Sequence, residues 1–382
     1  MSAGAALAAA VVVLTSGTAH AAPGWEAPTL PVTGNGALLG VTRVDSHISW
    51  AYGIGVTREG RAERHSPLLL SYDDRKSAAG WREVPVPAFG ETSNRISSVS
   101  ALSARDAWMV SDWEQTRGGI LTQHWDGTAW RQVTAPMPAG KFTDGGLLDV
   151  STRASDDAWA VGWATFIDSE RPNPDKPGGT IYETHAEALV EHWDGTSWQV
   201  MPMPRAADNW LTSVTAIAAD DVWASGYSDE DTPVAYHYDG TAWSQVPVPY
   251  SGINGELIDL EVRGPNDIWA AGRVLLDEED RGHALVAHWN GRVWRQVPVP
   301  SGTGRVRDLT LTPAGVVIVG QELDGTSYAM RRDGARWTRL AVPDGGTSSR
   351  YLASAAWTWQ GLTIAGTDFD AEGLPKPVLL TD

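Results

Sequence analysis

The sequence predicts an all-β protein, a seven-bladed β-propeller of four-stranded antiparallel blades whose ring is closed by pairing the N-terminal strand with the C-terminal blade. A unit of about 40–50 residues recurs along the chain, which is the length of one propeller blade. Most units carry two tryptophans at fixed places and an Asp-Gly or Asn-Gly pair before the second one. The 382 residues also include 40 glycines and 23 prolines, which indicate many tight turns between short strands.

Residues 147–204 show the pattern of a single blade. Strand a is expected at 147–151 and strand b at 157–162, and a long connection leads to strand c at 188–193. The next Asp-Gly pair joins strand c to strand d, because this pair favours the positive φ angles of a tight hairpin. Strand d ends in a Pro-x-Pro tail. Proline suits an outer edge strand, since it has no N–H to donate to a further neighbour.

The same landmarks return at equivalent positions in the other units. Each strand-b tryptophan follows an aspartate by two residues, and we expect this aspartate to cap the turn between strands a and b. A histidine also recurs in strand c, and the ring should spread these four histidines apart rather than bring them to one metal. The repeated residues are therefore expected to be structural: Trp108, Trp159, Trp223 and Trp269 in strand b, His124, His192, His237 and His288 in strand c, and Trp130, Trp198, Trp243, Trp294 and Trp337 in strand d.

The last unit stops after three strands, and the N-terminal segment supplies the missing one. Residues 25–31 match the strand-d pattern, with a tryptophan followed by a proline-rich tail. We therefore expect a signal peptide at 1–21 and one propeller domain at 22–382. Its blades should span about 37–87, 95–138, 146–204, 209–249, 255–300, 304–343, and 349–382 together with 25–31.

The first 21 residues have the features of an export signal. Ala5 to Leu14 form a short apolar stretch, and Ala19-His20-Ala21 matches a cleavage site, although no Lys or Arg precedes the stretch. About ten apolar residues are too few to span a bilayer, and no later membrane span is present. The sequence thus predicts a secreted, extracellular protein. Cysteine is absent, which excludes disulfides and thiolate chemistry.

The charge balance bears on the choice of partner. There are 47 acidic and 29 basic residues, giving a formal net charge of −18. Such a surface repels phosphate backbones, so no nucleic-acid partner is expected. Solubility is one explanation of the charge, and attraction to cations or to a basic partner is the other.

The repeat resembles that of the kelch family of propellers. The resemblance is carried by the run His124-Trp125-Asp126-Gly127-Thr128-Ala129-Trp130, by the Pro-x-Pro tail that follows, and by their copies. It covers nearly the whole mature chain and implies the propeller fold, in a secreted bacterial form. Kelch repeats carry a glycine pair at the end of strand b, where this chain has one glycine or none. The resemblance implies a fold and leaves function to be argued from sites.

The non-repeating connections are the candidates for binding. The b–c and d–a connections share one face of the ring and vary in length, whereas the short a–b and c–d turns share the other. Loops on a rigid scaffold commonly carry binding. Carboxylates and aromatic rings gather in these connections, a composition that suits sugars or a cationic partner. The candidate binding residues are Trp113, Trp163, Tyr182, Trp210, Tyr227, Asp229, Glu230, Asp231, Tyr250, Asp277, Glu278, Glu279, Asp280, Asp368, Phe369 and Asp370.

The longest connection runs from Thr165 to Ala186. Prolines stiffen its first half, and a Gly-Gly pair loosens its second half. We expect it to arch across the ring as a lid or to reach toward a partner, with a disordered loop as the alternative.

Three functions fit these observations. The first is a non-catalytic secreted propeller that recognises a protein or glycan partner through its acidic, aromatic face. The second is a lectin with a sugar site on each blade, using Trp125, Trp193, Tyr238 and Trp289, as a subunit of a larger secreted assembly. The third is a calcium-dependent hydrolase or lyase, because runs such as Asp277–Asp280 offer oxygen ligands. We expect no cofactor, with calcium as the alternative, and we predict no catalytic residue. The sequence leaves the oligomeric state open.

Overall fold

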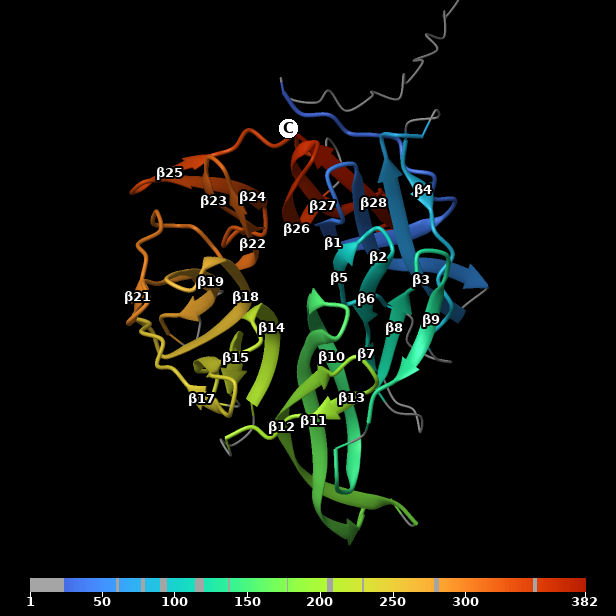
Figure 1. Ribbon diagram of the computed structural model, residues 1–382, viewed down its shortest axis with the longest axis vertical. Coiled ribbons are helices and arrows are strands. Elements are labelled where there is room, and N and C mark those ends of the chain that lie inside the picture. Colours follow the sequence, from blue (N-terminus) through green and yellow to red (C-terminus); the bar gives the residue numbers. More distant parts are fainter. Residues whose placement is uncertain are drawn as a thin grey trace, which may run out of the picture.

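The computed structural model describes residues 24–382 apart from 60–61, 77–79, 90–94, 114–119, 137, 177, 205–208, 229, 278–281 and 346–348. Every regular element in this part of the chain is a β-strand. Seven antiparallel sheets follow one another around a central axis in chain order, so the first and last sheets lie side by side (Figure 1). The protein is a seven-bladed β-propeller. The predicted signal peptide at 1–21 lies outside the described residues.

Within each blade the chain moves outward from the axis, from strand a to strand d. The first blade contains β1 (Asn35–Arg43), β2 (Ile48–Glu59), β3 (Ala62–Asp73) and β4 (Arg82–Glu83), and the second contains β5 (Ser98–Ser103), β6 (Asp106–Val110), β8 (Leu121–Trp125) and β9 (Trp130–Thr134). The third contains β10 (Phe142–Ala154), β11 (Asp157–Pro172), β12 (Thr180–Trp193) and β13 (Trp198–Val200), and the fourth β14 (Asn209–Ala218), β15 (Asp221–Ser228), β16 (Pro233–Tyr238) and β17 (Trp243–Gln245).

The remaining blades keep the same order. The fifth contains β18 (Asn254–Gly264), β19 (Asp267–Leu275), β20 (His283–Trp289) and β21 (Trp294–Gln296), and the sixth contains β22 (Val306–Thr312), β23 (Gly315–Gln321), β24 (Ser327–Asp333) and β25 (Arg336–Arg339). The seventh contains β26 (Ser349–Thr358), β27 (Gly361–Phe369) and β28 (Pro375–Thr381). An additional short strand, β7 (Asp112–Trp113), comes from the second blade and pairs with β10 of the third.

The N-terminal segment joins the seventh blade through one antiparallel bridge. The Glu26 N–H donates to the Thr381 carbonyl at 2.8 Å, and the Thr381 N–H donates to the Glu26 carbonyl at 2.9 Å. Trp25 is buried against Leu352 and Leu380 in the apolar cluster between the sixth and seventh blades. The expected strand at 25–31 is thus reduced to a bridge at its second residue.

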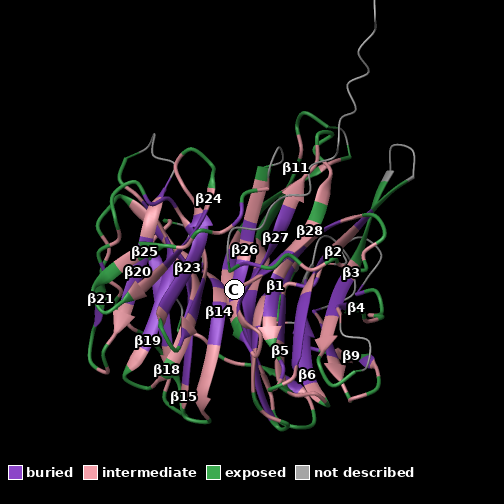
Figure 2. Cartoon of the chain, turned by 90° about the horizontal axis from the view of Figure 1, so that it is seen from above, coloured by how far each residue is buried: buried purple, intermediate pink, exposed green. Residues whose placement is uncertain are grey.

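Tryptophans pack in the apolar clusters between neighbouring blades, and Figure 2 shows that many strands are buried along much of their length. Trp159 of the third blade stacks on His192 with 4.2 Å between ring centroids and meets Trp243 of the fourth blade edge-on. The Trp159 Nε1–H donates to Asp157 at 2.8 Å, and His192 Nε2 lies 3.0 Å from the same carboxylate oxygen. Aspartate, tryptophan and histidine therefore form one structural unit.

The sequence predicted that the aspartate before each strand-b tryptophan caps the a–b turn, and this prediction is wrong. In the fourth and fifth blades, Asp221 and Asp267 hold their own Trp and His side chains in the same way, at 2.8–2.9 Å. The aspartate thus orients two side chains of its own blade rather than the backbone of the a–b turn. The recurring histidines are structural, as expected.

Glu191 is a buried acid without a partner. It lies in β12 with no exposed surface, and neither of its carboxylate oxygens has a hydrogen-bond partner. Burial raises the pKa of Glu191 to about 8, so the side chain carries a proton at neutral pH. The equivalent residue of the second blade is Gln123, whose Nε2 donates to the Pro87 carbonyl at 2.9 Å.

We predict that Glu191→Gln stabilises the protein increasingly as the pH rises. The Glu191 carboxyl ionises near pH 4.5 in the unfolded chain but near pH 8 in the folded protein. Below pH 4.5 it is protonated in both states, so its ionisation does not affect stability. Between pH 4.5 and 8 unfolding releases a proton, so the free energy of unfolding falls as the pH rises. Glutamine does not titrate. The variant should therefore gain on the order of a few kcal/mol relative to wild type between pH 4.5 and 8.

Urea unfolding at several pH values measures this difference. Gln123→Glu is the matched control, because it places the same acid in the second blade and should have the opposite effect. A difference between Glu191→Gln and wild type that does not change with pH would contradict the account.

Candidate functional site: the loop face and the central channel

Two β-hairpins extend from the face that carries the b–c and d–a connections, which we call the loop face; the opposite face, with the a–b and c–d turns, is the turn face. Figure 2 shows the ends of β2–β3 and β11–β12 rising beyond the ring. The predicted lid at 165–186 forms most of the second hairpin, since β11 and β12 remain paired as far as Pro172 and Thr180. The sequence suggested an arched or disordered loop here. The hairpin instead continues the two middle strands of its blade.

The candidate aromatic residues divide between the ring centre and the rim. Trp210 and Tyr227 lie opposite each other on β14 and β15, and their rings stack 5.5 Å apart with only 13° between their planes. Trp163 pairs with Gly146 on the innermost strand of its blade, where the backbone of Trp113 also pairs with Gly145. The others lie farther out: Tyr182 on the projecting hairpin with 48% of its surface exposed, Tyr250 partly buried in an interblade cluster, and Phe369 at the end of β27.

Several candidate acids already have structural partners. Asp368 forms a two-point ion pair with Arg350, with N–O distances of 2.6 and 2.7 Å. Asp370 accepts backbone N–H groups from its own turn, and Asp231 adopts a positive φ of 50° in another turn. Glu230 and Asp277 are exposed. Asp229, Glu278, Glu279 and Asp280 lie outside the described residues.

A second group of polar residues converges on the central channel, and the sequence analysis did not identify it. In six of the seven innermost strands, the pairing with strand b shifts by one residue at the same place, as in a β-bulge. The residue that follows this unpaired residue lies at the central channel. We call these residues, with the equivalent one of the second blade, the inner ring. They are Gly40, Ser98, Asp149, Ser213, Asp259, Asp308 and Ser354.

The inner ring ties each blade to the next by hydrogen bonds. Backbone N–H groups donate to the ring side chain of the preceding blade: Val214 to Asp149 at 2.8 Å, Leu260 to Ser213 at 3.2 Å, Leu309 to Asp259 at 2.8 Å, Ala355 to Asp308 at 2.6 Å, and Val41 to Ser354 at 3.3 Å. The Ser98 hydroxyl donates to Asp149 at 2.6 Å. Asp149 therefore links three blades.

In the first blade, a tyrosine takes the place of the inner-ring side chain. Its ring residue is Gly40, and a Cβ there would lie 2.1 Å from Cζ of Tyr52. Tyr52, on β2, fills the space that a ring side chain occupies elsewhere, and its hydroxyl forms hydrogen bonds with Ser98 and the backbone of Val99. Burial, together with the charges of two ring aspartates, raises its pKa. Glycine is required at position 40 because of this close approach.

The ring and the residues just beyond it line a cavity of about 270 Å³ that extends toward the turn face. Four carboxyl groups face it, three of them from the ring and the fourth from Glu261. Burial raises the pKa of Asp149 to about 6, and burial followed by the charges of Asp259 and Asp149 raises that of Glu261 to about 8. Burial and the hydrogen-bonded Asp259 raise the pKa of Asp308 well above its usual range. Glu261 therefore holds a proton at neutral pH, and the neutral form of Asp308 is favoured.

These carboxyl groups come from the innermost strands and not from the loop runs considered as calcium ligands. Within the described residues, no group of three or more His, Asp or Glu side chains is arranged to hold a metal ion. The ring oxygens instead accept N–H and O–H groups from neighbouring blades.

The opposite end of the channel carries arginine and aromatic residues. On each innermost strand, the residue three positions before the inner-ring residue lies one layer nearer the loop face. In blades four to seven these are Trp210, Glu256, Arg305 and Tyr351, and we call them, with their neighbours Tyr227, Arg273 and Arg307, the channel mouth. Arg273 pairs with Glu256 at 2.8 Å, and Arg307 lies over the Tyr351 ring at 5.3 Å from its centroid.

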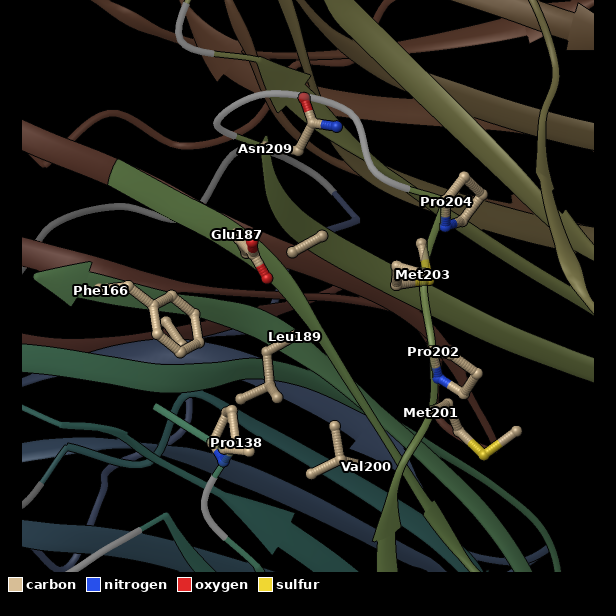
Figure 3. Close-up of a pocket in the computed structure, with 13 residues that line it drawn as sticks. Pro138, Phe166, Glu187, Leu189, Val200, Met201, Pro202, Met203, Pro204 and Asn209 are labelled. Carbon is tan, nitrogen blue, oxygen red and sulfur yellow. The ribbon is translucent and has the colours of Figure 1, made fainter. Parts of the chain in front are cut away.

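An apolar pocket of about 280 Å³ lies at the base of the projecting third-blade hairpin (Figure 3). The strand-d tail from Val200 to Pro204 forms one wall, with Met201 and Met203, and Phe166 and Leu189 form the other. Glu187 and Asn209 are its polar lining residues.

The inner ring does leave a trace in the sequence. An apolar residue, any residue, then Asp, Ser or Gly, and another apolar residue recur at the start of each blade, as in Leu147-Leu148-Asp149-Val150 and Leu211-Thr212-Ser213-Val214. The side chain at the third position varies, which hid the repeat. The channel mouth leaves no such trace, since its residues differ from blade to blade.

Comparisons with known proteins agree on the fold. No family model and no curated protein matches the sequence. The chain is similar to a structure described as YCF48 bound to D1 peptide, with a TM-score of 0.56, 15% identity, and coverage of 94% of this chain and 96% of that one. It is also similar to a chain of a mitotic checkpoint complex, with a TM-score of 0.54, 10% identity and 98% coverage of both chains. Likeness at these identities shows the propeller fold alone. Among the described residues there is also no helix long and apolar enough to cross a membrane.

We predict that Asp149→Ala lowers the free energy of unfolding by roughly 2–4 kcal/mol, because it leaves the Val214 N–H and two hydroxyl groups without their acceptor. Asp149→Ser, which installs the ring residue of the second, fourth and seventh blades, should lose less. Urea unfolding at pH 7 measures both, with the exposed Glu230→Ala as control. Equal midpoints for Asp149→Ala and wild type would show that the ring does not tie the blades together.

Proposed function

We propose that this protein is a non-catalytic, secreted binding propeller, of the kelch-like bacterial type, that recognises a protein partner through its loop face. The observation that carries this proposal is the difference between the two faces. Both extended hairpins and the arginine- and aromatic-lined channel mouth open on the loop face. The opposite face carries tight c–d turns, in which an Asp or Asn side chain caps the backbone and a glycine has positive φ.

The third-blade hairpin supports a charged partner. Its exposed side chains include Asp168, Glu183 and Glu187, which leave 52%, 65% and 44% of their surface open. Partial burial alone would lower the pKa of His185. The hydrogen bonds of its imidazole with Glu187 and Asp168 outweigh this effect, so the pKa is raised overall. A basic segment of a partner would find these carboxylates beside the exposed ring of Tyr182.

The structure gives the lectin alternative little support. Trp125, Trp193 and Trp289 each donate their indole N–H to a backbone carbonyl at 3.0–3.2 Å. Their rings, with that of Tyr238, pack against tryptophans of the adjacent interblade clusters. A sugar would have to compete with these contacts. Recognition of a protein partner, in the way the YCF48 structure is described as holding a peptide, uses surfaces that remain open.

We predict that a photo-crosslinking amino acid captures the same partner from the loop face only. One variant carries it at Tyr182, and the control carries it at Val293, a c–d turn residue of similar exposure on the opposite face. Both proteins are exposed to the secreted proteins of the organism that makes them, and the products are identified by mass spectrometry.

The expected result is one protein crosslinked from position 182 and absent from position 293. An excess of unlabelled wild-type protein should compete with this capture, whereas an unlabelled competitor in which residues 168–183 are replaced by Asn-Gly, which shortens the hairpin while keeping the ring, should not. Capture from both faces, or equal competition by the shortened protein and the wild type, would overturn the proposal.

A further inference from the structure

We propose that the channel mouth contains an oxyanion site, in which Arg305 and Arg307 bind one carboxylate or phosphate group. The proposal deepens the proposed function, because it names the chemical group that a partner presents at the ring centre, and it rests on the loop face being the binding face. The two arginines come from the start of the sixth blade, where Arg307 lies over the ring of Tyr351 of the seventh and Arg305 is close enough to feel the charge of Arg307.

Neither arginine has an acidic partner among the described residues, although three other arginines at this end of the ring do. Arg273 pairs with Glu256, Arg350 with Asp368, and Arg339 with Glu322. Arg307 has only the Tyr351 ring face, and its Nε is buried without a hydrogen-bond acceptor. Among the described residues, no carboxylate forms an ion pair with either guanidinium group, and Glu256, which acts on Arg305 through its charge, is already paired with Arg273.

The positive charge at this site is costly without a ligand. Both side chains are partly buried, and burial, followed by the charges of Arg307 and Arg273, lowers the pKa of Arg305. A partly desolvated charge that faces a like charge destabilises the protein unless an opposite charge reaches it. An anion would relieve this repulsion.

The carboxyl groups of the inner ring lie one layer below and form no ion pair with either arginine. Asp308, which immediately follows Arg307, instead accepts the Leu309 N–H on one oxygen at 2.8 Å and the Ala355 N–H on the other at 2.6 Å. Burial and the neighbouring Asp259 also raise the pKa of Asp308 well above its usual range, which favours its neutral form.

The geometry suits an oxyanion rather than a halide. Guanidinium groups present planar forks of N–H donors that match the oxygens of a carboxylate or a phosphate. On the fourth blade, the stacked rings of Trp210 and Tyr227 add apolar surface to the same layer. A group entering from the loop face would meet both arginines at its charged end.

Purified protein alone tests the site. Melting temperatures are measured at pH 7.5 in increasing acetate or inorganic phosphate, with chloride exchanged to keep the ionic strength constant. Binding to the folded state raises the melting temperature in a saturable way. The variants are Arg305→Gln and Arg307→Gln, and the matched control is Arg295→Gln, an exposed arginine of the outer strand β21.

We expect saturable stabilisation of the wild type, with the concentration at half effect rising about tenfold in each site variant and unchanged in Arg295→Gln. A response to acetate alone would identify a carboxylate as the natural ligand, and a response to phosphate alone a phosphate. Arg305→Lys, which keeps the charge but loses the fork, should bind with intermediate strength and serves if the glutamine variant does not fold.

Stabilisation that follows ionic strength alone, or that weakens equally in Arg295→Gln, would overturn the proposal. The outcome is separate from that of the crosslinking experiment. An anion site without crosslinks would refute the protein partner, and crosslinks without an anion site would refute only the role given to the two arginines.

Discussion

The structure depends on a geometric constraint at its axis. Seven innermost strands converge there, and side chains that point inward have little room and no solvent-rich surface. The bulge in these strands turns one short residue toward the axis, and in five blades its side chain accepts an N–H group from the next blade. Each of these bonds satisfies a backbone N–H group at the crowded centre of the ring. Tyr52 shows how strict the requirement is, because it supplies the polar group where Gly40 cannot.

The same convergence gives the channel two chemically different ends. Asp259 lies close enough to help raise the pKa of Asp149 and of Asp308, and Glu261 extends this acidic lining toward the turn face. One layer nearer the loop face, the side chains are no longer bound by the ring hydrogen bonds and vary freely between blades. Arginines and aromatic rings occur there, at the end of the molecule where the hairpins also project. Structural and variable residues are thus separated along the axis, which is the reason that we propose the loop face for binding.

The sequence predicted the architecture well because the repeat records local geometry. Asp-Gly turns, strand-b and strand-d tryptophans and the Pro-x-Pro tails each satisfy a demand that every blade makes, and their spacing alone located the sheets. It predicted the candidate site less well. Trp210 and Tyr227 do come together, as a stacked pair, but Asp368 is neutralised by Arg350, and Arg305 and Arg307 were not identified. Whether Arg305 and Arg307 lie near Tyr351 depends on which residues of successive blades lie in the same layer. The bulge in the innermost strands shifts this register by one residue, and it was not recognised in the sequence.

Hydrogen exchange at the ring amides tests the central claim most directly. If the inner ring holds the blades together, the N–H groups of Val214, Leu309 and Ala355 open only when the propeller unfolds globally. Their exchange, followed by residue-resolved mass spectrometry or NMR, should then report the same free energy as urea unfolding. Amides of the exposed c–d turns, such as that of Thr196, should exchange far faster. Ring amides that exchange as rapidly as the turn amides would contradict the account.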